Sequence, residues 1–114
     1  MHIPHKNATP VYETVKAKGY KLLETEATEY VELTLLKGGN VPSHSLNIPV
    51  TFYIAEGEGI LAINDNEITV NAGDMANSEA GATRELRNTG EGNLRVLVIK
   101  HKENSICALK GDLK

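Results

Sequence analysis

The sequence predicts an all-β protein in which short strands form one small barrel. The length of 114 residues fits a single domain, the apolar residues recur with a period of two, and clusters of Gly, Asn and Asp interrupt them at short intervals. A period of two places alternate side chains on opposite faces of a strand, whereas a helix repeats every ~3.6 residues. Many short strands separated by turns are typical of a sandwich or barrel.

The first predicted strand lies in residues 30–37, where Val31, Leu33 and Leu35 share one face. The alternation is longest in residues 44–54, and there we expect one parity to form a shared inward face. This face comprises His44, Leu46, Ile48, Val50, Phe52 and Ile54.

Three shorter apolar runs follow, at residues 60–63, 68–70 and 94–99, each bounded by turn residues. The last run is apolar on both parities, and a strand of this kind has to be covered on both sides. The N-terminal strands, the C-terminal tail or a second subunit could supply the second cover.

We expect one domain over residues 1–114, with a core at about 10–101 and a polar tail at 102–114 that is loosely packed or briefly helical. The single Cys107 cannot form an internal disulfide and reads as an ordinary free thiol. Because residues 1–6 lack the apolar core of a signal peptide, we expect a cytoplasmic protein.

The composition argues against two classes of partner. The net charge is −3, the 12 basic residues form no block, and the aromatic residues are only 4 Tyr and 1 Phe. This is a poor set for tracking phosphates or stacking bases, so we expect no nucleic-acid partner. No stretch approaches the ~20 apolar residues of a membrane-spanning helix, so we expect no membrane partner.

Two glycine-bounded segments carry a spacing signature. The first, residues 38–57, contains Gly38, five residues, His44-Ser45-Leu46, Val50 after three more, and Gly57 after a further six. The second, residues 73–88, contains Gly73, five residues, Glu79-Ala80-Gly81, Arg84 after two more, and Asn88 after a further three. The glycines are expected to close tight turns at positive φ, where a side chain would clash.

This spacing resembles the two motifs of the cupin superfamily, and the resemblance covers about half of the chain. It implies a double-stranded β-helix, the jelly-roll barrel, with alternate strand residues lining its interior. Family habit, together with the two-sided strand at 94–99, predicts a homodimer. In metal-bearing cupins, two His and one Glu of the first motif and one His of the second converge on one ion.

The sequence departs from that ligand set at three of the four positions. His44 stands at the first His position, but Leu46, Val50 and Arg84 occupy the others. Leucine and valine offer no donor atom, and arginine is a permanent cation. We therefore expect no metal and no cofactor. A relocated site around His44 stays an alternative, with Glu32, His2, His5 or His101 as further ligands.

Arg84 shares a parity with Leu86 and Asn88, which predicts that its side chain points inward. A buried guanidinium needs a partner, because burial of an unpaired charge is costly. That partner could be a carboxylate of this chain, Glu32 or Glu79, or the anionic or carbonyl group of a bound small molecule.

The sequence alone does not determine the specific function. The leading hypothesis is a metal-independent barrel that binds a small molecule in an apolar pocket. The expected pocket residues are His44, Leu46, Val50, Phe52, Arg84 and Leu86. One alternative is an enzyme, either a metal-free isomerase or epimerase with His44 as general base or a metalloenzyme with non-standard ligands. Another is a structural barrel whose interior is filled by its own core residues.

Overall fold

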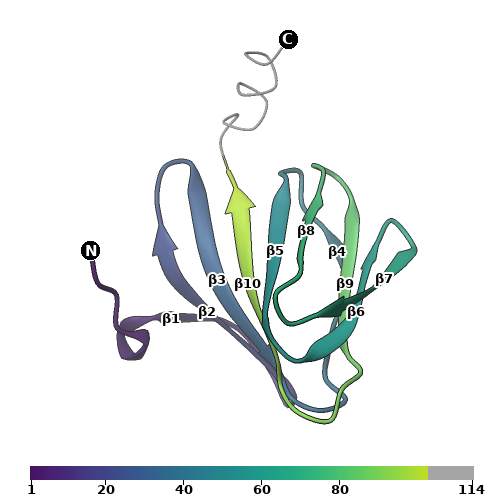
Figure 1. Cartoon of the computed structure of the whole chain (residues 1–114). Coiled ribbons are helices and arrows are strands. Elements are labelled where there is room, and N and C mark those ends of the chain that lie inside the picture. Colours follow the sequence, from purple (N-terminus) through teal and green to yellow (C-terminus); the bar gives the residue numbers. More distant parts are fainter. Residues whose placement is uncertain (103–114) are drawn as a thin grey trace.

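Ten strands and one short 3-10 helix make up residues 1–102, the part of the chain that the computed structural model describes (Figure 1). The elements are η1 (His5–Asn7), β1 (Thr9–Thr14), β2 (Ala17–Glu24), β3 (Thr28–Leu35), β4 (Asn40–Ser45), β5 (Val50–Glu56), β6 (Glu58–Ile63), β7 (Asn66–Asn71), β8 (Met75–Ser78), β9 (Thr83–Asn88) and β10 (Leu94–His101). The expectations for Cys107 and for the tail beyond residue 102 lie outside the described residues.

The strands form two antiparallel sheets, which confirms the all-β jelly-roll barrel. One sheet has the order β1-β2-β3-β10-β5-β8 and the other the order β4-β9-β6-β7. The inward side chains of both sheets pack into one hydrophobic core, to which β6, β7 and β9 of the smaller sheet contribute Leu61, Val70 and Leu86. No helix within residues 1–102 is long and apolar enough to cross a membrane.

The long alternation at residues 44–54 is divided between two strands. β4 ends at Ser45 and pairs with β9, whereas β5 begins at Val50 and pairs with β10 and β8. Residues 46–49 form the bend between the two sheets, and Pro49 cannot donate a ladder hydrogen bond there. Period two continues through this bend by coincidence, so the pattern predicts the inward face but not the change of sheet.

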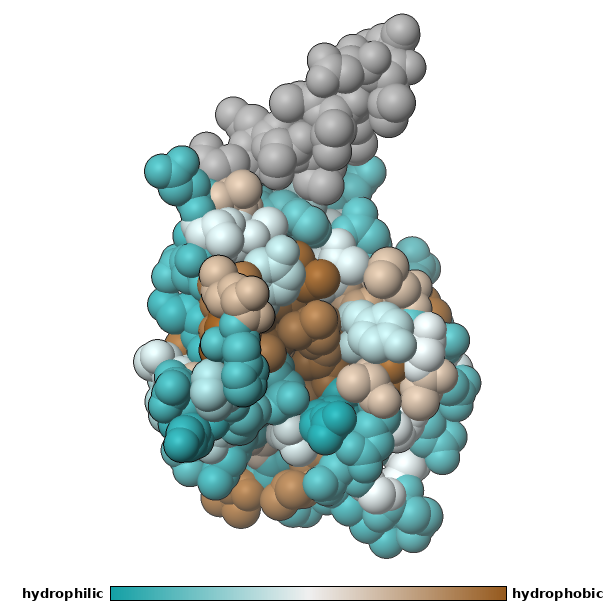
Figure 2. Space-filling view, turned by 60° about the vertical axis from the view of Figure 1, so that its left-hand side comes forward, coloured by the Kyte–Doolittle hydropathy of each residue, from teal (hydrophilic) through white to brown (hydrophobic). Residues whose placement is uncertain are grey.

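The side chains of β10 that sequence parity predicts to face inward are buried. Leu94, Val96 and Val98 are buried in β10, and the remaining apolar residues of that strand, Leu97 and Ile99, are half-buried on its outer side. Figure 2 shows one face of the molecule on which apolar atoms gather at the centre inside a hydrophilic rim. The homodimer predicted from this strand stays a prediction.

Four glycines of the two motifs close turns as expected. Gly38, Gly57, Gly73 and Gly81 all have positive φ, between 76° and 95°. At Gly57 the requirement is strictest, because φ is 89° and a Cβ atom there would overlap the backbone carbonyl oxygen of Asn93. The motif glycines therefore fix the loops at the ends of the barrel.

Candidate functional site

A pocket of about 460 Å³ lies between the two sheets. All six residues that the sequence predicts for a pocket line it, and they come from both walls of the barrel: His44, Leu46, Val50, Phe52, Arg84 and Leu86. Its volume falls within the range of small-molecule sites, roughly 300–1,000 Å³. The open interior contradicts the alternative of a barrel filled by its own core. Ligand binding by these residues stays a prediction.

The entrance lies between β1 and β4, which are one edge strand from each sheet. Val11 of β1 and the exposed Pro42, Ser43 and His44 of β4 all line the pocket. Both edge strands are irregular here, because register shifts fall at Val11 in β1 and between Val41 and His44 in β4. A bulge bends its strand and redirects side chains, so the irregular pairing shapes the lip of the pocket.

The residues that line and close the pocket change along the direction of the strands, and we divide them into a lower, a middle and an upper level. Its middle level is apolar, with Phe52 beside Val98 on one wall and Leu86 beside Leu61 on the other. The lower level is filled by side chains that are almost fully buried and do not line the pocket: Leu35, Ile54, Leu94 and Val96. The pocket is therefore an apolar cup with a closed floor.

Arg84 forms the polar wall at the upper level, and its side chain is buried, with only 3% of the residue exposed. Its Nε atom donates to Ser78 Oγ at 2.5 Å, and its Nη2 atom donates to the backbone oxygens of Ile48 at 2.8 Å and Glu79 at 3.0 Å. The Nη1 atom is buried without any partner within residues 1–102. Burial lowers the pKa of the Arg84 guanidinium.

The predicted carboxylate partner of Arg84 is not found among the described residues. Glu79 contributes its backbone oxygen instead of its carboxylate, and Glu32 pairs with His5 Nε2 at 2.8 Å. Three neutral oxygens therefore surround a buried cation. Such oxygens satisfy N–H groups, but they do not cancel the charge.

His44 stands beside Arg84 in the cross-strand register, at the exposed lip of the pocket. Its Nδ1 atom lies 3.3 Å from the carbonyl oxygen of Pro42. Because a carbonyl only accepts, the tautomer that makes this contact a hydrogen bond carries its proton on Nδ1, and in the neutral ring Nε2 is then the acceptor nitrogen.

Sequence reasoning missed further polar residues of the pocket: Tyr12, Ser43, Glu85 and Lys100. The sequence does contain a signal that places Lys100 in the pocket, because Lys100 shares the parity of Val96 and Val98 and must point to the same side of the sheet. Tyr12 had none, since it follows a bulge in β1 that breaks the period.

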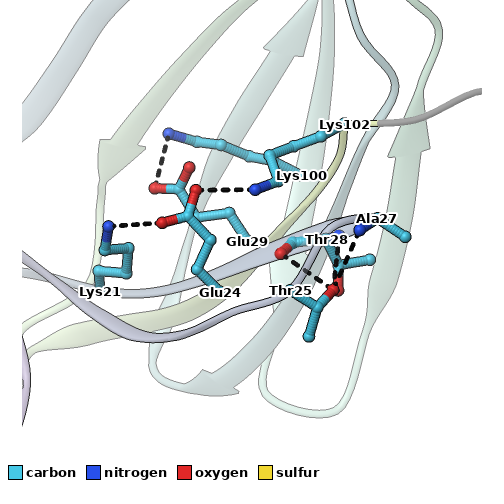
Figure 3. Close-up of polar contacts among 8 residues, drawn as sticks. All are labelled: Lys21, Glu24, Thr25, Ala27, Thr28, Glu29, Lys100 and Lys102. Atoms are coloured by element: carbon cyan, nitrogen blue, oxygen red, sulfur yellow. Dashed lines mark hydrogen bonds and ion pairs between the residues drawn. The ribbon is translucent and has the colours of Figure 1, made fainter.

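Three lysines lie close together at the upper ends of β2, β3 and β10 (Figure 3). Glu24 holds two of them, with its carboxylate oxygens 2.8 Å from Lys21 Nζ and 2.7 Å from Lys102 Nζ. Hydrogen bonds from Lys102 and Lys21 lower the pKa of Glu24 to about 2. Within residues 1–102, the carboxylate paired with Lys100 is a distant one, with Lys100 Nζ 3.9 Å from Glu29 Oε2.

Two antiparallel sheets around an internal pocket define a jelly-roll barrel. The model of the cupin domain family matches residues 31–100, and the chain belongs to this family. A comparison with curated proteins found no match.

Solved structures share the fold at low sequence identity. A predicted oxalate decarboxylase from Thermotoga maritima is 23% identical, with a TM-score of 0.78 over 89% of this chain and 98% of that one. The polyketide cyclase RemF from Streptomyces resistomycificus is 18% identical, with a TM-score of 0.76 over 90% and 80%. KdgF from Halomonas sp. is 8% identical, with a TM-score of 0.77 over 93% and 97%.

The residues present do not fit the metal ion that many cupins hold. His44 is the one usual donor at the four expected ligand positions, and Arg84 places a cation at another. Within residues 1–102 no three His, Cys, Asp or Glu side chains lie close enough to hold a metal together. Of the proposed substitutes, Glu32 pairs with His5, and His101 Nε2 contacts Thr51 Oγ1 at 2.9 Å.

Proposed function

We propose that this protein is a metal-independent barrel that binds a small molecule with an apolar body and a polar, anionic or carbonyl-bearing end. The observation that supports it best is the pocket itself, an apolar cup with a closed floor and one buried cation in its wall. Small-molecule sites typically combine a mostly apolar lining with few oriented polar groups.

Arg84 supplies the polar anchor in this proposal. It lines the pocket, it has no carboxylate partner in the described part of the chain, and its Nη1 atom makes no hydrogen bond there. In a wall of low dielectric constant, an uncompensated cation attracts negative charge far more strongly than it does in water. The proposal therefore favours ligands that carry an anionic group or a carbonyl oxygen.

The pocket can be tested with N-phenyl-1-naphthylamine, an uncharged dye that fluoresces in apolar sites. We expect saturable binding that excess EDTA does not change. Val98→Phe and Leu61→Phe fill the pocket from opposite walls, and each is expected to weaken dye binding by about tenfold or more. Ile68→Phe adds the same ring at an exposed position on β7 and serves as the matched control.

Three outcomes would contradict this proposal. Dye binding that EDTA abolishes, and that an added divalent metal restores, would show a metal site. Equal binding by the filled variants and by Ile68→Phe would place the dye outside the pocket. No dye binding by the wild-type protein would remove the pocket as a ligand site. Thermal unfolding of each variant shows whether it is folded before binding is compared.

An enzyme remains the second candidate, and the geometry of His44 is what favours it. In the neutral tautomer that carries its proton on Nδ1, the Nε2 atom is an acceptor at the entrance, in register with Arg84, so it could take a proton from a molecule held by that cation. The expected result is loss of turnover in His44→Ala with unchanged ligand affinity. Equal loss of affinity and turnover would assign His44 to binding instead.

A further inference from the structure

The upper level of the pocket carries a cation on each wall. On the larger sheet, Lys100 pairs with Val50, which in turn pairs with Ser78. On the smaller sheet, Arg84 lies at the same level, because its Nε atom donates to Ser78 Oγ. With strands spaced ~4.8 Å apart, the backbone positions of Lys100 and Ser78 are about 10 Å apart across two strands. Both cationic residues line the pocket.

Lys100 is the least firmly held lysine of its neighbourhood. Figure 3 shows Glu24 bonded to Lys21 and Lys102, whereas the carboxylate that Lys100 faces in the described part of the chain is that of Glu29. That contact measures 3.9 Å, against 2.7 Å for the pair of Lys102 with Glu24. A pair this long adds little stability, so an incoming carboxylate can replace Glu29 at small cost.

The acid among the lining residues does not neutralise this level. Glu85 has the opposite parity from Arg84 on β9, and its Oε1 atom lies 3.9 Å from Nε of Arg87, which shares that parity, so its carboxylate is directed away from the two cations. Below the two cations the lining is apolar, and the floor is closed by buried side chains. An anionic group is therefore favoured at the upper level of the pocket and disfavoured below it.

We propose that the ligand is an amphipathic monocarboxylate whose head group lies between Lys100 and Arg84 and whose apolar body lies over Phe52, Leu61 and Leu86. Lys100 is then a second anchor, which exchanges the carboxylate of Glu29 for that of the ligand. This inference rests on the proposed function, because it needs the pocket to bind a small molecule.

Displacement of the uncharged dye by four ten-carbon compounds tests the charge requirement. Decanoate should displace it at a concentration about tenfold lower than decan-1-ol does. Decylammonium, which carries the opposite charge, should be weaker than both. Decanedioate should be weaker than decanoate by about tenfold or more, because its second carboxylate would lie in the apolar floor.

Two lysine variants test the second anchor. Lys100→Met should weaken displacement by decanoate about tenfold and leave decan-1-ol unchanged. Lys102→Met removes the same charge from a residue that is held by Glu24 and does not line the pocket, so it should change neither compound more than about twofold.

Outcomes that contradict this inference can be distinguished from outcomes that contradict ligand binding in the pocket. If the dye binds but decanoate and decan-1-ol displace it equally well, the carboxylate head is wrong and the apolar pocket stands. If both lysine variants weaken decanoate alike, the effect is one of overall charge and Lys100 is not an anchor. If neither compound displaces a bound dye, the ligand class is wrong.

Discussion

Strand β9 carries a buried polar side chain at each end, and the two are built differently. Asn88 at the lower end is 6% exposed and has all of its polar atoms bonded: Nδ2 donates to the backbone oxygens of Leu35 and Gly92, and Oδ1 accepts from the backbone N–H of Gly90. Arg84 at the upper end is equally buried but leaves Nη1 without a partner in the described structure.

The difference shows how one strand can serve both stability and binding. At the lower end every neutral group has its hydrogen bond, which is the normal condition of a buried polar side chain. At the upper end a charge is held by neutral oxygens beside an open pocket, which adds little to stability and leaves attraction for an anion. We therefore expect a ligand at the upper end of β9, where the Arg84 guanidinium lacks a full set of partners.

The largest effect on stability is expected at the satisfied end. Asn88→Ala leaves two backbone oxygens and one backbone N–H without their partner, and should lower the free energy of unfolding by about 3 kcal/mol. Urea unfolding followed by circular dichroism measures this change. The control is Asn66→Ala at an exposed position, expected to change it by about 0.5 kcal/mol or less. If Asn88→Ala and Asn66→Ala lower the free energy of unfolding equally, the hydrogen bonds of Asn88 do not stabilise the lower end of β9 as we infer.

Removal of the charge at the other end should cost much less stability. Arg84→Met removes a buried cation that has no carboxylate partner within residues 1–102. The two backbone acceptors of Arg84 belong to half-buried Ile48 and exposed Glu79, where water can replace the lost donor, so the same urea measurement should change by about 1 kcal/mol or less in either direction. The affinity of this variant for decanoate should fall, whereas its affinity for the uncharged dye should not. A loss of stability as large as that of Asn88→Ala would make Arg84 a structural residue.

The smallest effect concerns acid sensitivity near the upper end. Because Lys102 and Lys21 lower the pKa of Glu24 from its ordinary 4.5 to about 2, the ionised carboxylate favours the folded state. This contribution is complete above pH ~4.5 and is lost as the pH falls toward about 2. Carboxyl chemical shifts should report the low midpoint by NMR.

Glu24→Gln should flatten the decline of the melting temperature over that acid range. Glu26→Gln, which removes an exposed carboxylate from the same hairpin, is the control and should leave the decline unchanged. An equal flattening in both variants would attribute the decline to net charge instead of to the two lysine contacts. High salt should reduce the effect, since these groups are exposed to solvent.

Much of the fold follows from the sequence because glycine spacing and period-two alternation report on local geometry. The turns at Gly38 and Gly57 need positive φ, and the spacing marks them directly. The alternation does not reveal when a chain leaves one sheet for another, so the bend at residues 46–49 was missed. N-terminal strands are expected from the sequence, but the bounds of β1 and β2 are not, because residues 9–24 mix polar and apolar side chains without a clear period.

The site was less predictable than the fold. Parity alone predicted that Arg84 points inward, and its burial bears this out. Its partners could not be predicted, because they are a hydroxyl group and two backbone oxygens from other strands and loops, and no residue pattern encodes their positions. The expected ion pair with Glu32 or Glu79 failed for this reason.

The irregular edges of the barrel also bear on how the protein behaves at high concentration. An open sheet edge is a template on which another chain can add a strand, which is the first step toward amyloid-like ladders. Both edges beside the pocket contain a proline, Pro10 in β1 and Pro42 in β4, next to a bulge. A strand cannot pair continuously along such an edge, so the pocket can stay open without making the barrel prone to aggregate there.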